Sequence, residues 1–166
     1  MIKRLLIFST TVFLLASCVK SPDISCPYQE SGAVAPASEV STLQAWINTY
    51  HPGATKHASG FFYESVTPGT GTVTPTVCSN VTVKYTGTLT NLTKFDENLT
   101  GYSSVLGALI IGWQKGVPLI KSGGSIVLYI PPSLGYGSQD VKNSAGAVII
   151  PANSILIFSI QLVAVQ

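Results

Sequence analysis

Three segments in the second half of the chain alternate in residue type, which limits the folds open to it. Val81–Tyr85, Ile126–Ile130 and Leu156–Leu162 each place an apolar residue at every second position. This period is typical of β-strands that turn one face to a core. Leu109–Val117 is apolar around Trp113 without such alternation, and we interpret it as one short helix. Several strands with a single helix to cover one sheet face predict an α+β fold.

An N-terminal extension, residues 39–72, is expected to add a helix and a strand. Apolar residues recur at helical spacing from Ser38, a candidate N-cap, to Tyr50. Phe61–Val66 has the composition of a strand, and the prolines and glycines of Pro68–Gly71 predict the turn that ends it. The extension therefore precedes the alternating segments without repeating them.

The first 18 residues have the features of an export signal. Lys3 and Arg4 precede the apolar run Leu5–Ala16, which is shorter than the roughly 20 residues that a membrane span needs. Cys18 directly follows a Leu-Ala-Ser triplet, which resembles the lipobox of bacterial lipoproteins. The resemblance implies a signal peptide at residues 1–17 and a lipid on Cys18. An ordinary signal peptide followed by an incidental cysteine is the alternative.

Removal of that peptide would leave a chain of balanced charge. Two of the nine basic residues lie in it, so seven remain against seven acidic residues. This balance argues against nucleic acid as a partner, and against any partner chosen by bulk charge. Residues 18–38 are small and polar, contain prolines and a glycine, and show no apolar period, which predicts a tether.

The two cysteines beyond the export signal are Cys26 and Cys78. An even number of cysteines in an oxidising compartment favours a disulfide. We therefore predict a Cys26–Cys78 bridge that ties the N-terminal segment to the domain, with two unpaired buried thiols as the alternative. The spacing matches no zinc motif and the chain has only His51 and His57 as histidines, so no metal site is expected.

The residues in the second half that could serve a site are aromatic or apolar, with one carboxylate. They occur in the segments YTGTL from Tyr85, FD at Phe95–Asp96, LIIGW ending at Trp113, GYG around Tyr136 and IIPANS from Ile149. No GxSxG elbow, phosphate loop or nucleophile–base pair accompanies them. Such a set favours a reaction in which no covalent bond forms or breaks.

The order and spacing of these five segments resemble the FKBP-type peptidyl-prolyl cis/trans isomerases. Residues 73–166 are similar to one complete domain of that family. The resemblance implies a bent antiparallel β-sheet wrapped around one short helix, preceded here by the N-terminal helical extension. It also implies an apolar active-site pocket between the sheet and the helix.

The resemblance assigns a role to each matching position. The catalytic residues that it implies are Tyr85, Asp96 and Tyr136. The substrate-binding residues that it implies are Phe95, Tyr102, Leu109, Ile110, Trp113, Ile149, Ile150 and Phe158. A tryptophan floor with aromatic and aliphatic walls suits a prolyl ring, and a tyrosine hydroxyl can hold the substrate carbonyl. Asp96 could orient Tyr85 or act on the twisting carbonyl, and both roles stay open.

Three positions depart from the family pattern. Asn91-Leu92 stands where the family commonly has an Asn-Gly hairpin, and Ala108 replaces a polar residue before the aliphatic pair. Gly137–Gly146 makes the loop after Tyr136 longer than in minimal members, at the expected substrate entrance. These departures leave the rate open.

The function that the resemblance implies is rotation of X-Pro bonds in exported or envelope proteins, without a cofactor. The implied partners are proline-containing polypeptides, macrolide inhibitors, and a membrane through the N-terminal lipid, with the outer membrane favoured. No coiled-coil pattern argues for a dimer, so a monomer is expected. The alternatives are a non-catalytic peptide-binding module with the same pocket, and an unrelated β-rich structural lipoprotein whose aromatic residues would not converge.

Overall fold

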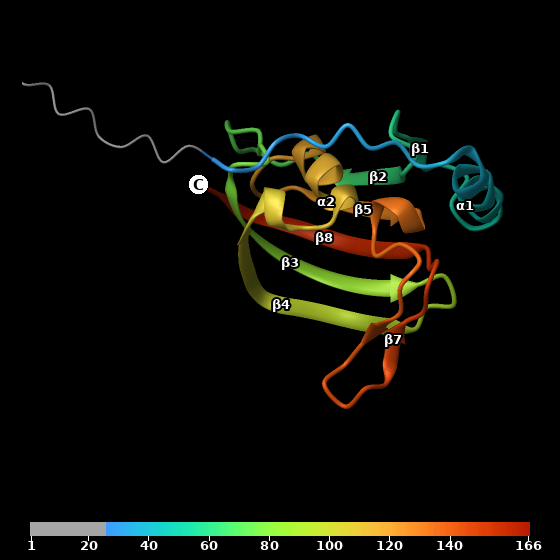
Figure 1. Cartoon of the computed structure of the whole chain (residues 1–166). Helices are drawn as coiled ribbons and strands as arrows, with labels where there is room; N and C mark the ends of the chain where they lie inside the picture. The colour runs from blue at the N-terminus through green and yellow to red at the C-terminus, as the bar shows by residue number, and fades with distance from the viewer. Residues whose placement is uncertain (1–25) are drawn as a thin grey trace, which may run out of the picture.

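One curved antiparallel sheet forms most of the protein (Figure 1). The computed structural model describes residues 26–166, so the predicted signal peptide, 1–17, and lipidation residue, Cys18, lie outside it. The six strands, in their order across the sheet, are β1 (Thr55–Lys56), β2 (Phe62–Thr67), β5 (Ser125–Ile130), β8 (Leu156–Val165), β3 (Asn80–Leu89) and β4 (Lys94–Val105). The α+β class predicted from the alternation is confirmed.

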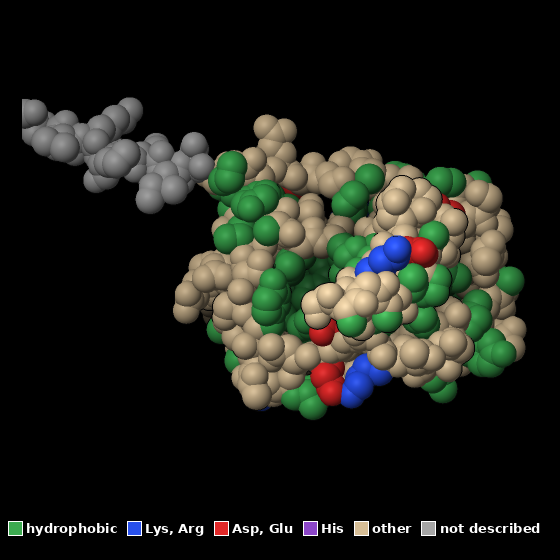
Figure 2. Space-filling model, turned by 60° about the horizontal axis from the view of Figure 1, so that its bottom comes forward, with side chains coloured by type: hydrophobic (Ala, Val, Ile, Leu, Met, Phe, Trp, Pro, Cys, Tyr) green, Lys and Arg blue, Asp and Glu red, His purple; other side chains and the backbone are tan. Residues whose placement is uncertain are grey.

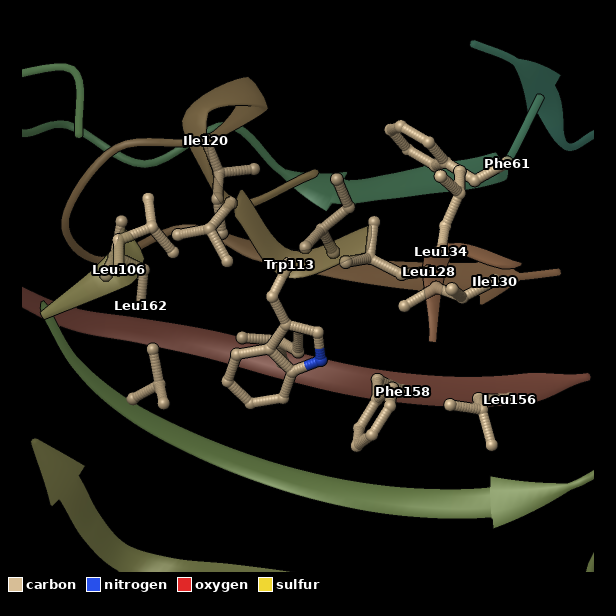
Figure 3. Packing of buried hydrophobic residues seen from close by; sticks show 14 of the residues in the cluster. Phe61, Leu106, Trp113, Ile120, Leu128, Ile130, Leu134, Leu156, Phe158 and Leu162 are labelled. Carbon is tan, nitrogen blue, oxygen red and sulfur yellow. The ribbon is translucent and has the colours of Figure 1, made fainter. Parts of the chain in front are cut away.

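The register of the sheet gathers the alternating apolar residues on its inner face. Leu128 of β5 pairs with Phe158 of β8, and Ile126 pairs with Ile160. All four side chains are buried in one cluster, which Figure 3 shows at close range. Burial of each such side chain stabilises the fold by about 1.5–3 kcal/mol, so the sequence pattern determines which face turns inward.

Helix α2 (Ile111–Gly116) covers this inner face and is shorter than the helix predicted from Leu109 to Val117. It lies between two single-turn 3₁₀ helices, η1 (Leu106–Ala108) and η2 (Val117–Leu119). Leu109 is extended, with φ −92° and ψ 172°. Its carbonyl accepts a hydrogen bond from the Gln114 side chain at 2.7 Å, which satisfies the carbonyl without a helical turn.

Two glycines allow α2 to lie directly on strand β5. Gly112 and Gly116 are four residues apart and therefore share one face of the helix. A Cβ at Gly112 would lie 2.6 Å from the Ile130 side chain, and a Cβ at Gly116 would lie 2.6 Å from Leu128. Only glycine permits this approach, which brings Trp113 down between helix and sheet (Figure 3).

Helix α1 (Ala37–Tyr50) covers the opposite face of the same strands. Its fully buried Leu43 and Ile47 pack with Phe62 and Tyr129 in a second cluster. Pro36, not the predicted Ser38, occupies the N-cap, and Ser38 lies in the first turn. In the part of the chain described, no helix has both the length and the apolar character that a membrane crossing requires.

The segment before α1 lies against the domain, whereas its composition had predicted a tether. A disulfide joins Cys26 to Cys78, as predicted. The Ala35 amide donates to the Ser59 carbonyl at 3.0 Å, and the Lys115 ammonium donates to a backbone carbonyl in the same segment. Residues 26–36 are therefore part of the folded unit, because bridge and hydrogen bonds hold a stretch that lacks an apolar period.

The long segment after Tyr136 forms a hairpin, whereas the sequence predicted a loop. Strands β6 (Val141–Lys142) and β7 (Val148–Ile150) pair in a separate two-stranded sheet that projects from the main sheet (Figure 1). The Asn143 side chain accepts from the Ala147 amide at 3.0 Å within the turn, and Gly146 has φ +82°. The Asn and Gly positions were the available turn signal.

The Gly112→Ala variant tests the close approach of α2. Alanine is the better helix former by about 1 kcal/mol, so helix propensity alone predicts a more stable protein. Overpacking against Ile130 costs about 1–3 kcal/mol, and we expect the free energy of unfolding to fall by about 1 kcal/mol in urea denaturation. Gly53→Ala, where no atom lies within 4 Å of the added Cβ, serves as control. A stabilised Gly112→Ala variant would contradict the packing argument.

Loss of the disulfide should lower stability through the unfolded chain. The bridge closes a sequence separation of 52 residues, for which chain entropy predicts about 4 kcal/mol as an upper value. We expect the double variant Cys26→Ser, Cys78→Ser to lose up to this amount in urea denaturation. Dithiothreitol should destabilise the wild type and leave the double variant unchanged. An equal response of both proteins would show that the bridge is absent in solution.

Candidate functional site

A cavity of about 160 Å³ opens between α2, the inner face of the sheet and the loop after η3 (Pro132–Leu134). Figure 2 shows a hollow with hydrophobic side chains on its walls. The residues that line the cavity are Tyr85, Asp96, Tyr102, Leu109, Ile110, Trp113, Tyr136 and Phe158. All eight belong to the set predicted from the sequence, so the structure brings most of that set together.

Trp113 lines the cavity and is only 4% exposed. The rings of Tyr85 and Phe158 each lie 5.1 Å from it between centroids, at interplanar angles of 83° and 89°. Edge-to-face contacts of this kind favour one orientation of each ring, because the positive edge of one meets the negative face of another. The three rings therefore form a rigid apolar surface.

The indole nitrogen of Trp113 has an unused hydrogen-bond donor. Within residues 26–166 it is the one buried side-chain nitrogen or oxygen without a partner. A buried N–H without an acceptor costs about 1–3 kcal/mol. The fold therefore tolerates this cost at a residue that lines the cavity.

One carboxylate orients the polar edge of the cavity. The Tyr85 hydroxyl donates to Asp96 Oδ2 at 2.7 Å. Burial raises the pKa of Tyr85 well above its ordinary value, and the hydrogen bond and charge of Asp96 raise it further. Burial also raises the pKa of Tyr136, with Asp96 as the next cause. Both hydroxyls therefore remain protonated donors at neutral pH.

Two irregularities in the β3–β4 ladder place residues of β4 at the cavity. Gly87 pairs with Asp96, but Thr88 pairs with Lys94, so Phe95 is an extra residue on β4. A second shift falls between the pairs Val83–Tyr102 and Tyr85–Asn98. Bulges bend a strand and redirect its side chains. Here Asp96 lies between the two irregularities, and Tyr102 directly follows the second.

Gly87 lies beside the cavity wall and was not among the site residues predicted from the sequence. A Cβ there would lie 2.6 Å from the Phe95 ring and 2.8 Å from the Phe158 ring. Those two rings meet edge to face, with centroids 5.4 Å apart and an interplanar angle of 86°. A side chain at residue 87 would collide with both of them. A glycine inside an otherwise alternating strand was the signal, since it marks close approach of another group.

Three predicted binding residues lie beside the cavity and do not line it. Phe95 packs behind Phe158, as the preceding contact shows. Ile150 is 3% exposed and belongs to the main core, and Ile149 packs against the same cluster. Phe95 therefore supports the wall through Phe158, whereas Ile149 and Ile150 of strand β7 pack with the core.

The loop that carries Tyr136 is held by backbone hydrogen bonds. The Pro132 carbonyl accepts from Gly135 and from Gly137, each at 2.9 Å, and the Gly137 carbonyl accepts from Asn153 at 2.8 Å. Gly137 has φ +69°, a conformation that glycine adopts most readily. Tyr136 itself stays 43% exposed, which leaves its hydroxyl accessible from the cavity mouth.

Comparison with known proteins identifies the family. The model for FKBP-type peptidyl-prolyl cis-trans isomerases matches residues 71–163, more than half of the chain. The chain therefore belongs to the FKBP-type peptidyl-prolyl isomerase family. The fold predicted from the resemblance, a bent antiparallel sheet around one short helix with an N-terminal helix, is confirmed by solved structures of the same family.

Relatives in bacteria include the FKBP-type isomerase FkpA of Buchnera aphidicola from Schizaphis graminum, 41% identical over 117 residues. FkpA of Escherichia coli K12 is 38% identical over 117 residues. The alignments cover 69% of this chain and 44% and 41% of those two relatives, so the chain spans less than half their length.

A crystal structure of FkpA from Escherichia coli superposes with a TM-score of 0.65 at 34% identity, covering 78% of this chain and 58% of that one. A peptidyl-prolyl isomerase from Pseudomonas syringae pv. tomato gives 0.66 at 27%, covering 81% of this chain and 99% of the other. The second comparison covers nearly the whole of the solved chain.

The Tyr85–Asp96 bond can be tested through the pKa of Tyr85. We expect Asp96→Asn to lower that pKa relative to wild type, leaving the part of the shift that burial causes, in an NMR titration of tyrosine ring carbons. The pKa of Tyr85 in the folded protein lies above the value of 10.0 in the unfolded chain. The protonated phenol therefore stabilises the fold fully below pH 10.0, and this contribution is lost as the pH rises through the folded-state pKa. Tyr129, whose pKa is raised by burial and Glu64, should be unaffected. Equal Tyr85 values in both proteins would rule out the bond.

Proposed function

We propose that this protein is a peptidyl-prolyl cis/trans isomerase that rotates X-Pro bonds in exported or envelope proteins. The observation that supports the proposal best is the convergence of Tyr85, Asp96, Trp113, Tyr136 and Phe158 on one cavity, whose lining is mainly aromatic and aliphatic residues. The relatives FkpA of Buchnera aphidicola and of Escherichia coli are FKBP-type peptidyl-prolyl cis-trans isomerases by name. A cavity volume of about 160 Å³ suits one small ring such as that of proline.

The chemistry follows from the electronic structure of the amide. Resonance gives the C–N bond partial double-bond character, with a rotation barrier of about 18–20 kcal/mol. The twisted transition state has less charge separation than the planar ground state. A dry apolar wall such as Trp113 and Phe158 therefore disfavours the planar form relative to the twisted one, and this difference lowers the barrier.

The polar groups at the rim have separate tasks in this mechanism. The prolyl ring packs on the indole of Trp113, and the Tyr136 hydroxyl donates to a substrate carbonyl and holds it in place. Asp96 holds the Tyr85 ring through the 2.7 Å hydrogen bond. That bond supports the orienting role for Asp96, since the carboxylate oxygen faces the phenol.

The site of action is also part of the proposal. We propose that Cys18 is lipidated, that residues 19–25 link the lipid to the folded unit, and that the protein acts as a monomer at the outer membrane. The Leu-Ala-Ser-Cys sequence and the Cys26–Cys78 disulfide support an oxidising compartment. Incorporation of labelled palmitate into wild type but not into Cys18→Ser tests the lipid, and equal labelling of the two would refute it.

The activity is tested by following isomerisation of a tetrapeptide with leucine before proline. Uncatalysed exchange takes tens to hundreds of seconds, so even weak catalysis is measurable. We expect Tyr136→Phe to lower kcat/KM by about fivefold, the value of one hydrogen bond. Tyr50→Phe, at a tyrosine that is 63% exposed on α1, serves as the matched control. A folded wild type no faster than buffer would refute the proposal.

The same peptide distinguishes the non-catalytic binding module. The chain has two tryptophans, Trp46 on α1 and Trp113 in the cavity, so a Trp46→Phe background reports on Trp113 alone. An isomerase changes both fluorescence and exchange rate. A fluorescence change without acceleration would favour the binding module, and a macrolide inhibitor of the family that competes with the peptide would localise binding to the cavity.

A further inference from the structure

The N-terminal helix holds the loop that carries Tyr136. Glu39, in the first turn of α1, accepts two hydrogen bonds at Oε2 from Ser133 of η3, one from the amide at 2.9 Å and one from the hydroxyl at 2.7 Å. The two residues are 94 positions apart in the chain. Both bonds are exposed to solvent, and one carboxylate oxygen accepts both of them. Hydrogen bonds to a charged group are stronger than neutral ones in the same setting.

Ser133 and Tyr136 move together because they share one hydrogen-bonded turn. Pro132, next to Ser133, accepts the amides of Gly135 and Gly137 on either side of Tyr136. Leu134 between them is fully buried. We therefore expect a displacement of Ser133 to displace the backbone of Tyr136, since both residues belong to this hydrogen-bonded turn.

The helix that presents Glu39 is itself firmly attached. Leu43 and Ile47 are fully buried against the outer face of the sheet. At the C-terminal end of α1, His51 Nδ1 lies 2.8 Å from the Tyr129 hydroxyl, which donates to Glu64. Glu39 therefore contacts the loop from a helix whose position is fixed by packing and hydrogen bonds.

Packing does not replace these two hydrogen bonds. An open surface pocket of about 280 Å³ lies where α1 faces the loop, and it is lined by Ser38, Glu39, Thr42, Pro132, Asn153 and Ile155. Side chains on opposite sides of such a pocket make few contacts with one another across it. Much of the mechanical coupling between helix and loop at this point therefore depends on Glu39.

We propose that Glu39 is a positioning residue for Tyr136 in the isomerase reaction, an inference that rests on the proposed function. Glu39 is not among the residues that line the cavity, and it acts on Tyr136 through Ser133. Glu39 lies outside residues 71–163, which the family model matches. The N-terminal helix thus supplies a support that the matched domain lacks, and this gives the extension a role in substrate binding.

The first experiment measures kcat and KM for the tetrapeptide with the full chain. We expect Glu39→Ala and Ser133→Ala each to lower kcat/KM by about three- to fivefold, mainly through KM, because Tyr136 holds ground and transition states alike. Glu39→Gln, which keeps an acceptor, should recover part of the loss. Gln44→Ala, which removes an exposed bond to Asn48 on the same helix, is the control and should match wild type.

A double-mutant cycle separates positioning from general stability. In a Tyr136→Phe background, Glu39→Ala should cause no further loss, since the hydroxyl that it positions is gone. The same three- to fivefold loss in both backgrounds would overturn the proposal and indicate a structural role. So would Glu39→Ala kinetics equal to wild type.

A measurement that does not depend on catalysis separates the positioning role of Glu39 from the isomerase activity. The NMR signal of the Tyr136 ring carbons should broaden or shift in Glu39→Ala, whereas that of Tyr129 should not. If wild type proves inactive, the proposed function fails, and the ring signal still decides whether Glu39 holds the loop. An unchanged Tyr136 signal would refute the positioning role.

Discussion

The contact between α2 and strand β5 is the one on which the rest of the site depends. Gly112 and Gly116 bring the helix backbone to the sheet. Trp113, which directly follows Gly112, enters the space between helix and strands as a consequence. The edge-to-face contacts of Tyr85 and Phe158 are made with that indole. Larger side chains on the helix face would lift Trp113 away and separate the aromatic walls, because a close-packed interior cannot absorb two extra methyl groups without movement.

The two faces of the sheet have different tasks. The inner face holds α2 and the cavity, whereas the outer face holds α1, whose position is fixed by Leu43 and Ile47. Through Glu39 and Ser133 the outer helix reaches the loop of Tyr136. In the proposed reaction, the apolar floor excludes water and the polar residue at its rim orients the substrate.

Much of the fold was predictable from particular residues. The alternation around Leu128 and Phe158 predicted strands and their inner faces, and the ordered motifs predicted all eight residues that line the cavity. The bounds were less accurate: Leu109 is extended where a helix was expected, since Gln114 satisfies its carbonyl. Residues 26–36 were predicted as a tether because they lack periodicity, yet a disulfide and scattered hydrogen bonds hold them.

The sequence by itself determined which residues are apolar, at what period, and therefore which face of each strand is buried. It also carried the motif order that identifies the family. Only the tertiary structure decided that Phe95 lies behind Phe158, that Gly87 leaves room for both rings, and that Glu39 meets Ser133. The physical reason is that local patterns report the energy of burial, which depends on each residue and its near neighbours. Contacts between distant segments depend on strand register, bulges and helix placement, which the whole chain sets together.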